Sequence, residues 1–262
     1  MNKVASLLSA CLLAANPALG QDVSDMAHVE ILTGWQMENG NRMAAIRISL
    51  EPGWHTYYRA PGESGIPPQI DLTGSNNIAS MRLHWPSPEL HVSNGMWYLG
   101  YEDELLLPIE LSPLGGGDFR LNGVMEFGVC DDVCVPMSVQ LGADFNASQT
   151  PSYTQEIRAA LADQPALIEN ATCDAVPLQD GMRLTASLKV PELSGDEVAV
   201  VEHPDKSIWV SQAMLSRAGG TLEIESDLVP PSAQPFMLER SALTITVVGG
   251  GKAYQANGCK GS

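Results

Sequence analysis

The sequence predicts an all-β protein made of two β-sandwich domains that a short helical linker joins. The main observation is a series of short segments in which apolar and polar residues alternate, separated by Pro, Gly and Asn. A second observation is one stretch, residues 150–165, where the apolar spacing becomes that of a helix. The third is the length of 262 residues, which is enough for two cores of ordinary size.

Residues 21–149 form the first predicted domain. Its clearest strand is the segment 42–50, where Ile46, Ile48 and Leu50 alternate with polar residues, the period of a half-buried strand. Many short strands at this spacing are typical of a sandwich. The other predicted strands lie at residues 29–33, 54–58, 81–85, 105–111, 120–127 and 133–141.

The linker helix rests on two local patterns. Ser152 and Gln155 have the spacing of a capping box, which predicts a helix start. Ile157, Ala160 and Leu161 fall along one helical stripe.

Residues 166–262 form the second predicted domain, again a β-sandwich. The run from Gly249 to Gly251 before Lys252 resembles part of a phosphate-binding loop, but it lacks the spacing and the Ser or Thr of a P-loop. We therefore interpret it as a turn. The predicted strands lie at residues 183–188, 197–201, 221–225 and 243–248.

The first twenty residues predict export. Lys3 precedes an apolar stretch over residues 4–15, and small residues follow at Ala18 and Gly20. This is the pattern of a signal peptide over residues 1–20, cleaved before Gln21. We expect the mature chain in the periplasm, an oxidising compartment, where the even number of cysteines left after cleavage would pair.

An alternative places a lipid anchor at Cys11, at the end of the run Leu8-Ser9-Ala10-Cys11. The apolar stretch ahead of that site is short for a signal peptide. No later stretch has the uninterrupted apolar length of a spanning helix, so we expect no membrane insertion of the mature chain.

The charge of the chain is strongly negative. The sequence has 14 Lys and Arg against 31 Asp and Glu, a formal net charge of −17, and cleavage would also remove Lys3. Nucleic acid and anionic membrane surfaces would repel such a protein. We therefore expect neither as a partner.

The four cysteines of the mature chain divide into two pairs. A bridge between Cys173 and Cys259 would close a loop across most of the second domain and stabilise it by about 4 to 5 kcal/mol in the chain-entropy model. We predict that this bridge is structural. Cys130 and Cys134 enclose only three residues, so their bridge removes much less unfolded-state entropy and is the better redox candidate.

Cys130 and Cys134 fit the tip of a β-hairpin whose arms are residues 127–129 and 135–140. Facing residues in an antiparallel pair have Cα separations of about 4.5 to 5.5 Å, which a disulfide tolerates. Asp131 and Asp132 in the loop oppose thiolate formation by charge repulsion. Reactivity must therefore come from groups that the fold or a partner brings in.

Two other interpretations of this pair stay open. A hairpin-tip disulfide that never turns over is one, because many exported cysteines are simply paired. A metal clip is the other, but a closed tetrahedral site needs two more ligands. The histidines at 55, 84 and 91 do not stand at a recognisable ligand spacing from the pair, and we predict no metal and no organic cofactor.

Four ordered motifs carry a resemblance to a known family: residues 53–68 (GWHTYYRAPGESGIPP), 85–88 (WPSP), 100–108 (GYEDELLLP) and the cysteine hairpin. From about residue 27 to 145 the chain resembles the N-terminal periplasmic domain of the thiol:disulfide interchange protein DsbD, and more closely its ScsB-like relatives. The resemblance implies an immunoglobulin-like sandwich whose two cysteines pass electrons from a membrane-embedded partner domain to periplasmic thiol proteins. It also implies a connection with cytochrome c biogenesis.

The resemblance implies roles for individual residues. Cys130 and Cys134 correspond to the redox couple, with Cys134 attacking a substrate disulfide and Cys130 resolving the mixed disulfide. His55 and Tyr57 fall where the family places aromatic neighbours of the couple.

A cap loop that shields the sulfurs is expected at residues 91–98 by the same resemblance. Met96, Trp97 and Tyr98 would supply its bulk, next to a flexible Gly95. Ordinary core packing is the alternative for each of these side chains, because large aromatics are usually mostly buried.

The resemblance also implies the partners. The sequence ends at Ser262 before the membrane and thioredoxin-like domains of the full-length relatives, so we expect a separate membrane-embedded electron donor. Thioredoxin-like or disulfide isomerase-like proteins of the periplasm are the expected partners. The predicted function is that of a thiol-disulfide oxidoreductase acting through a mixed disulfide. The alternative is a non-catalytic binding module, either a metal or copper chaperone or an adaptor of a membrane redox complex.

Overall fold

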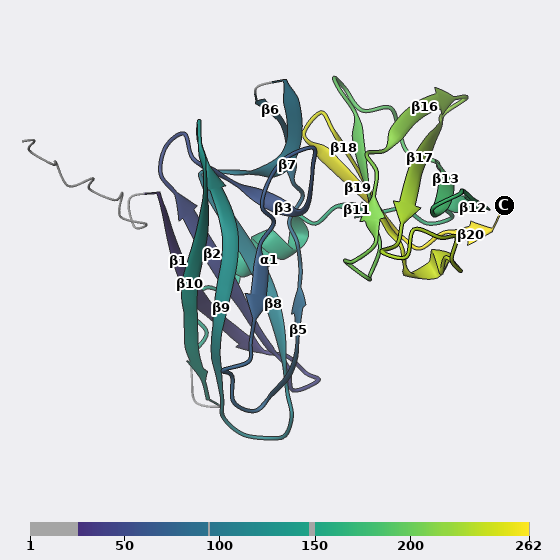
Figure 1. The fold of residues 1–262 in the computed structure, drawn as a ribbon. Helices are drawn as coiled ribbons and strands as arrows, with labels where there is room; N and C mark the ends of the chain where they lie inside the picture. Colours follow the sequence, from purple (N-terminus) through teal and green to yellow (C-terminus); the bar gives the residue numbers. More distant parts are fainter. Residues whose placement is uncertain (1–25, 94, 147–149, 262) are drawn as a thin grey trace, which may run out of the picture.

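The computed structural model describes residues 26–93, 95–146 and 150–261. The predicted signal peptide and Cys11 lie outside the described residues. The described residues form mainly β-strands, with one α-helix and one short 3₁₀ helix (Figure 1). Antiparallel pairing dominates its sheets, and the prediction of an all-β, immunoglobulin-like sandwich fold is confirmed.

The first sandwich is built from two sheets. One has four strands in the order β1-β2-β8-β5, and the other has six, in the order β10-β9-β3-β7-β6 with β4 paired to β9. The strands are β1 (Ala27–Gln36), β2 (Arg42–Leu50), β3 (His55–Gly62), β4 (Gln69–Asp71), β5 (Ile78–Leu83), β6 (Glu89–Ser93), β7 (Met96–Glu102), β8 (Glu104–Pro113), β9 (Phe119–Cys130) and β10 (Cys134–Phe145).

The apolar core of the first sandwich lies between these sheets. Ile46 and Ile48 on β2 are fully buried, as their alternation predicts, and they face the core with Leu107 and Ile109 of β8. Tyr58 of the opposite sheet packs into the same cluster. The strand β2 has the bounds that its pattern predicts, because one buried face repeats at every second residue.

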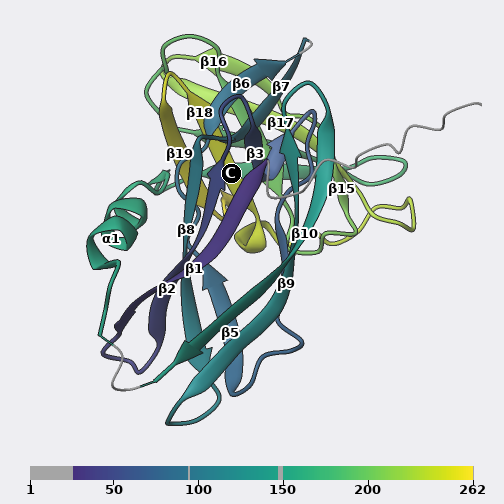
Figure 2. The ribbon, with the colours of Figure 1, turned by 90° about the vertical axis from the view of Figure 1, so that its left-hand side faces the viewer.

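The single α-helix, α1 (Thr154–Ala162), follows the first sandwich. Ile157 is fully buried against Leu32 and Met43, which attaches α1 to the outer face of the four-stranded sheet (Figure 2). The predicted capping box is wrong. The N-cap is Tyr153 without a side-chain cap, and the Ser152 hydroxyl instead donates to the carbonyl of Thr150 at 3.3 Å.

The second sandwich also has a four-stranded and a six-stranded sheet, in the orders β11-β19-β18-β14 and β15-β17-β13-β12-β20, with β16 paired to β17. The strands are β11 (Ala166–Leu167), β12 (Thr172–Pro177), β13 (Met182–Leu188), β14 (Val198–Glu202), β15 (Trp209–Val210), β16 (Met214–Ala218), β17 (Thr221–Val229), β18 (Thr244–Gly249), β19 (Lys252–Asn257) and β20 (Lys260–Gly261); the 3₁₀ helix η2 (Arg240–Ala242) precedes β18.

Two features of the second sandwich bear on the sequence predictions. The triple glycine is a hairpin turn, since Gly249 pairs with Lys252 while Gly250 and Gly251 have φ values of +54° and +69°. A disulfide joins Cys173 on β12 to Cys259 just before β20, and both residues are buried. This bridge links two neighbouring strands that pair in parallel.

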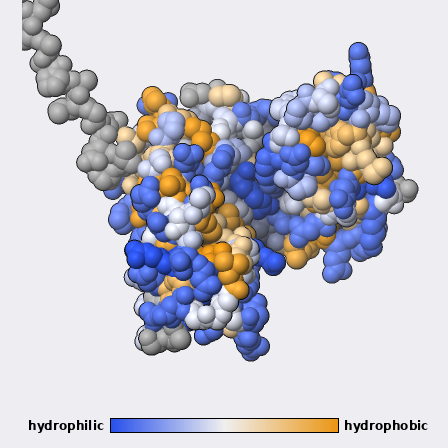
Figure 3. Space-filling view, turned by 60° about the horizontal axis from the view of Figure 1, so that its bottom comes forward, coloured by the Kyte–Doolittle hydropathy of each residue, from blue (hydrophilic) through white to orange (hydrophobic). Residues whose placement is uncertain are grey.

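The two sandwiches meet along a seam beside β3, β6 and β7 (Figure 1). Val200, Val248 and Ala253 of the second sandwich belong to the same buried apolar cluster as the first core. On one face, the surface between the sandwiches is hollowed and hydrophilic (Figure 3). The seam is thus apolar inside and polar at its edge.

Candidate functional site

Cys130 and Cys134 form a disulfide at the tip of the long β9–β10 hairpin. They are paired residues of the antiparallel register, their Cα atoms are 4.1 Å apart, and residues 131–133 make the loop between them. Their exposure differs sharply, because Cys130 is 1% exposed whereas Cys134 lies open to solvent. A reagent or partner can therefore reach one sulfur directly and the other only through its cover.

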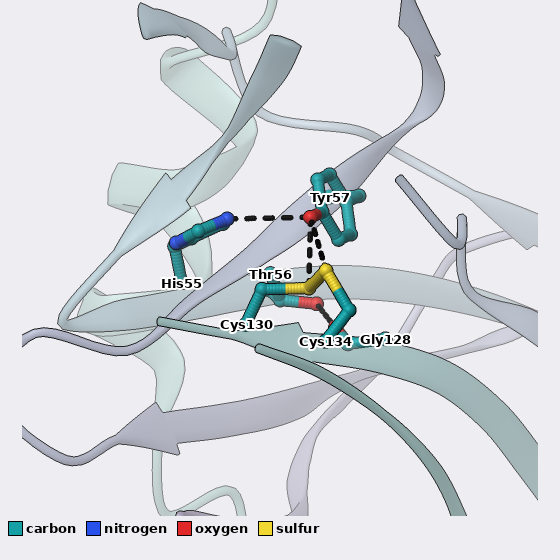
Figure 4. The surroundings of a disulfide bond; sticks show 6 residues. All are labelled: His55, Thr56, Tyr57, Gly128, Cys130 and Cys134. Carbon is teal, nitrogen blue, oxygen red and sulfur yellow. Dashed lines mark hydrogen bonds between the residues drawn. A yellow bond between two sulfur atoms is a disulfide. The ribbon is translucent and has the colours of Figure 1, made fainter. Parts of the chain in front are cut away.

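Tyr57 contacts both sulfurs. Its hydroxyl donates to Cys130 Sγ at 2.8 Å and lies 3.3 Å from Cys134 Sγ (Figure 4). His55 Nε2 is 3.3 Å from the same hydroxyl oxygen. Both side chains come from β3, which reaches the disulfide because His55 pairs with Cys130 in the sheet.

Two glycines, Gly65 and Gly128, leave room for the Tyr57 ring. Gly65 has a φ of +125°, and a Cβ there would lie 2.4 Å from the Tyr57 ring. A Cβ on Gly128 would lie 2.9 Å from Ile66, and the Gly128 carbonyl accepts a 2.9 Å hydrogen bond from the Thr56 hydroxyl. These residues were missed by sequence reasoning, although Gly65 and Ile66 lie within the first of the four motifs.

Behind Tyr57, three rings stack on one another. The ring of His55 lies 4.4 Å from that of Tyr98, which in turn lies 5.0 Å from that of His91, both nearly parallel. His91 Nδ1 lies 3.1 Å from a carboxylate oxygen of Glu102. Tyr98, Tyr57 and Cys130 form a small buried cluster, so Tyr98 helps to cover the buried sulfur.

Burial sets the protonation of these side chains. It lowers the pKa of His55, and the neighbouring His91 lowers it further. Burial also raises the pKa of Tyr57, and it is the main reason why the pKa of Tyr98 rises to about 12. At neutral pH His55 is therefore neutral and Tyr57 keeps its proton, which is free to be donated to a cysteine sulfur.

The segment predicted as a cap loop belongs to a β-hairpin, β6–β7, in which Ser93 pairs with Met96. Its residues alternate between two faces, and the pairing with β3 satisfies backbone groups that a loop would leave open. Tyr98 points to the disulfide. Trp97 points to the other face, where its ring packs on Gly62, and Met96 is 47% exposed near the turn.

Within the described part of the chain, no three or more His, Cys, Asp or Glu side chains are grouped so that they could hold a metal ion. Helices of the length and apolarity needed to cross a bilayer are likewise absent from residues 26–93, 95–146 and 150–261.

Comparison with known proteins finds a family model that matches the first sandwich. Residues 28–145 match the family described as thiol:disulfide interchange protein DsbD, N-terminal. The cysteine hairpin, β3 and the β6–β7 hairpin all lie inside this segment. The match to the DsbD N-terminal family thus covers the first sandwich, where the motifs predict it.

Among solved structures, the chain is similar to the N-terminal periplasmic domain of ScsB from Proteus mirabilis, with 24% identity and a TM-score of 0.67 over 93% of this chain and 97% of that one. It is also similar to the DsbD N-terminal domain of Neisseria meningitidis in the reduced form, with 13% identity and a TM-score of 0.31 over 51% of this chain and 96% of that one. No curated protein matches. The first similarity extends over both sandwiches and shows that the whole fold is shared. A DsbD-type sandwich with a Cys130–Cys134 disulfide fits a thiol-disulfide interchange module.

Proposed function

We propose that this protein is a periplasmic thiol-disulfide oxidoreductase that passes electrons between a separate membrane-embedded or thioredoxin-like donor and periplasmic thiol proteins. The observation that carries the proposal is the unequal exposure of the couple. Cys134 is open to a partner, while Cys130 is buried under Tyr57 and Tyr98. One sulfur is thus available for attack and the other is held as an internal leaving group.

Reduction of the disulfide begins with the thiolate of the donor, which attacks Cys134 Sγ in line with the disulfide bond. The Cys130–Cys134 bond breaks, and Cys130 leaves as a thiolate that accepts the hydrogen bond from Tyr57. A mixed disulfide then joins Cys134 to the donor. The second cysteine thiolate of the donor then attacks the donor sulfur of this mixed disulfide. That step releases Cys134 as a thiolate and leaves the donor as a disulfide, oxidised by two electrons.

Transfer to the acceptor uses the same steps in reverse. The Cys134 thiolate attacks the acceptor disulfide and forms a mixed disulfide with it. Cys130 then attacks Cys134 Sγ, which restores the Cys130–Cys134 bond and releases the acceptor with two thiols. Because the electrons arrive and leave on sulfur, the reaction needs no organic cofactor.

The periplasmic location rests on the predicted signal peptide and on the description of the ScsB structure as a periplasmic domain. Thioredoxin-like partners are proposed because the first sandwich matches the DsbD N-terminal family. The acidic loop residues Asp131 and Asp132 lie beside Cys134, so the partner's reactive surface is expected to tolerate negative charge.

Trapping the mixed disulfide in cells tests the proposal. In a Cys130→Ala variant of the full-length protein the resolving thiol is missing, so Cys134 should stay linked to its partner, and mass spectrometry would identify that partner. The matched control is Cys134→Ala, which leaves only the buried Cys130 and should trap nothing. A wild-type Cys130–Cys134 bridge that stays oxidised in cells, with no adduct in the variant, would show a static adaptor instead. Metal bound by the reduced protein would support a chaperone.

A further inference from the structure

The second sandwich holds the strand that carries the redox-site tyrosine. Arg59 on β3 forms an ion pair with Glu202 of β14, in which Arg59 Nε donates to both carboxylate oxygens at 3.0 and 3.1 Å. Arg59 Nη2 donates to Gln255 Oε1 on β19 at 2.7 Å. The Arg59 guanidinium lies 4.5 Å from the centre of the Tyr58 ring. Glu202 is only 8% exposed, so water screens this pair weakly.

Arg59 lies in an irregularity of β3. The strand pairs regularly with β7 up to Tyr57, and the register then shifts before Gly62 pairs with Tyr98. A β-bulge of this kind redirects side chains. Here it separates the site residues His55 and Tyr57 from the seam residue Arg59, although all belong to one strand.

Trp97 and Tyr98 link the seam to the site in a second place. They are neighbours on β7, so their side chains point to opposite faces of the sheet. Trp97 packs on Gly62 and, with Val200 and Gln212 of the second sandwich, lines a small pocket at the seam. Tyr98 faces the other way, onto Tyr57 and Cys130. Both elements that cover Cys130 contact the second sandwich, β3 at β14 and the β6–β7 hairpin at β18.

We propose that the second sandwich positions the cover of Cys130, with Arg59, Glu202 and Trp97 as positioning residues that hold β3 and the β6–β7 hairpin against the buried sulfur. This inference rests on the proposed redox function and assigns a role in it to the second sandwich. Loss of the Arg59–Glu202 pair loosens the bulged part of β3 and the hairpin next to it. Tyr57 and Tyr98 then cover Cys130 for a smaller fraction of the time.

The test measures how fast Cys130 reacts with iodoacetamide. A Cys134→Ser background leaves Cys130 as the single free thiol of the pair while the Cys173–Cys259 bridge stays closed. Adding Glu202→Ala should raise the rate of Cys130 alkylation about tenfold, because the rate follows the fraction of molecules in which the cover is open. Glu202→Gln, which keeps one hydrogen-bond acceptor for Arg59, should give a smaller increase.

The matched control is Glu197→Ala. Glu197 makes a comparable partly buried pair with Arg217 at 2.6 Å, but entirely within the second sandwich. The Glu197→Ala variant should change the rate of Cys130 alkylation less than twofold, even if it lowers the melting temperature as much as Glu202→Ala does. Equal rates for the two variants would overturn the positioning role. If Glu202→Ala does not fold, Gln255→Ala removes a single seam hydrogen bond and takes its place.

The outcome is separable from that of the proposed function. Alkylation by a small reagent needs no partner protein. An unchanged Cys130 alkylation rate in Glu202→Ala would therefore refute the positioning role of the second sandwich without affecting the electron-transfer proposal. Failure of the Cys130→Ala trap, in contrast, removes the electron-transfer proposal whatever the alkylation rates are.

Discussion

The hydroxyl of Tyr57 lies 2.8 Å from Cys130 Sγ and 3.3 Å from Cys134 Sγ, so a single phenol contacts both sulfurs of the disulfide. Tyr57 is buried, and burial raises its pKa, so it remains a hydrogen-bond donor at neutral pH. A donor at this position stabilises negative charge on whichever sulfur carries it. Since no Lys or Arg lies between the two cysteines, the phenol compensates in part for the two aspartates of the loop.

Removing this hydroxyl should slow thiol-disulfide exchange. In Tyr57→Phe the departing Cys130 thiolate loses a hydrogen bond worth about 1.5 to 3 kcal/mol for a charged group. Reduction of Cys130–Cys134 by dithiothreitol should therefore slow by at least about tenfold. The rate is measured by quenching with acid and counting alkylated cysteines by mass spectrometry.

Tyr101→Phe is the control for that measurement. Tyr101 is also buried in the first sandwich, and its hydroxyl donates to the Pro86 carbonyl at 2.9 Å, away from the disulfide. Its loss should lower stability without changing the exchange rate. A rate for Tyr57→Phe equal to that of Tyr101→Phe would mean that the phenol only fills space.

The two disulfides should open in sequence under graded reduction. Cys134 is exposed, whereas Cys173 and Cys259 are 0% and 9% exposed, and attack requires access to a sulfur. Mild reductant should therefore open Cys130–Cys134 well before Cys173–Cys259, as alkylation and peptide mapping can show. Simultaneous opening of both bridges would refute the distinction between a redox bridge and a structural one.

The structural bridge should matter more for stability. The Cys173–Cys259 bridge spans a sequence separation of 86, and in the chain-entropy model its loss costs about 4 to 5 kcal/mol. Urea unfolding of Cys173→Ala with Cys259→Ala should show this decrease in the free energy of unfolding. Cys130→Ala with Cys134→Ala, whose sequence separation is 4, should lose less than about half as much. Equal losses would contradict the division of roles.

Acidification should destabilise the protein through His55. Its pKa in the folded protein lies below the ordinary value for histidine of about 6.5, chiefly because of burial. The unfolded chain therefore binds this proton at a higher pH than the folded one does. The stability that neutral His55 provides is complete above about pH 6.5 and is lost as the pH falls from there to the folded pKa.

Melting temperatures of His55→Gln and wild type between pH 7.5 and 5 would test this expectation. The variant should lose less stability than wild type across that interval, since it has no proton to take up at this site. His28→Gln, which changes an exposed histidine on β1, is the control and should follow the wild type. Parallel curves for His55→Gln and wild type would assign the pH dependence to other groups.

Local pattern accounts for the elements that were predicted well. The alternation of Ile46, Ile48 and Leu50 determines β2, because its face toward the core must be apolar at every second residue. The three-residue spacing of Cys130 and Cys134 predicts the hairpin register that the structure has. The apolar stripe around Ile157 predicts α1, although Ser152 does not cap it.

The β6–β7 hairpin shows where local pattern fails. Its residues 91–98 have no strong alternation, since Trp97 and Tyr98 are both large and aromatic and both bury much of their surface. Trp97 lines the pocket at the seam and Tyr98 packs against Cys130. A strand that packs on both faces resembles a short apolar loop in sequence.

The sequence by itself determined the all-β class and the place of Cys130 and Cys134 at a hairpin tip, because both depend on residues close together in the chain. Only the tertiary structure decided which sulfur is exposed, which aromatic covers the other, and how the second sandwich reaches the site. Those features depend on contacts between distant residues, such as Arg59 and Glu202 at a separation of 143. Such contacts form only when the sheets pack, so no local pattern records them.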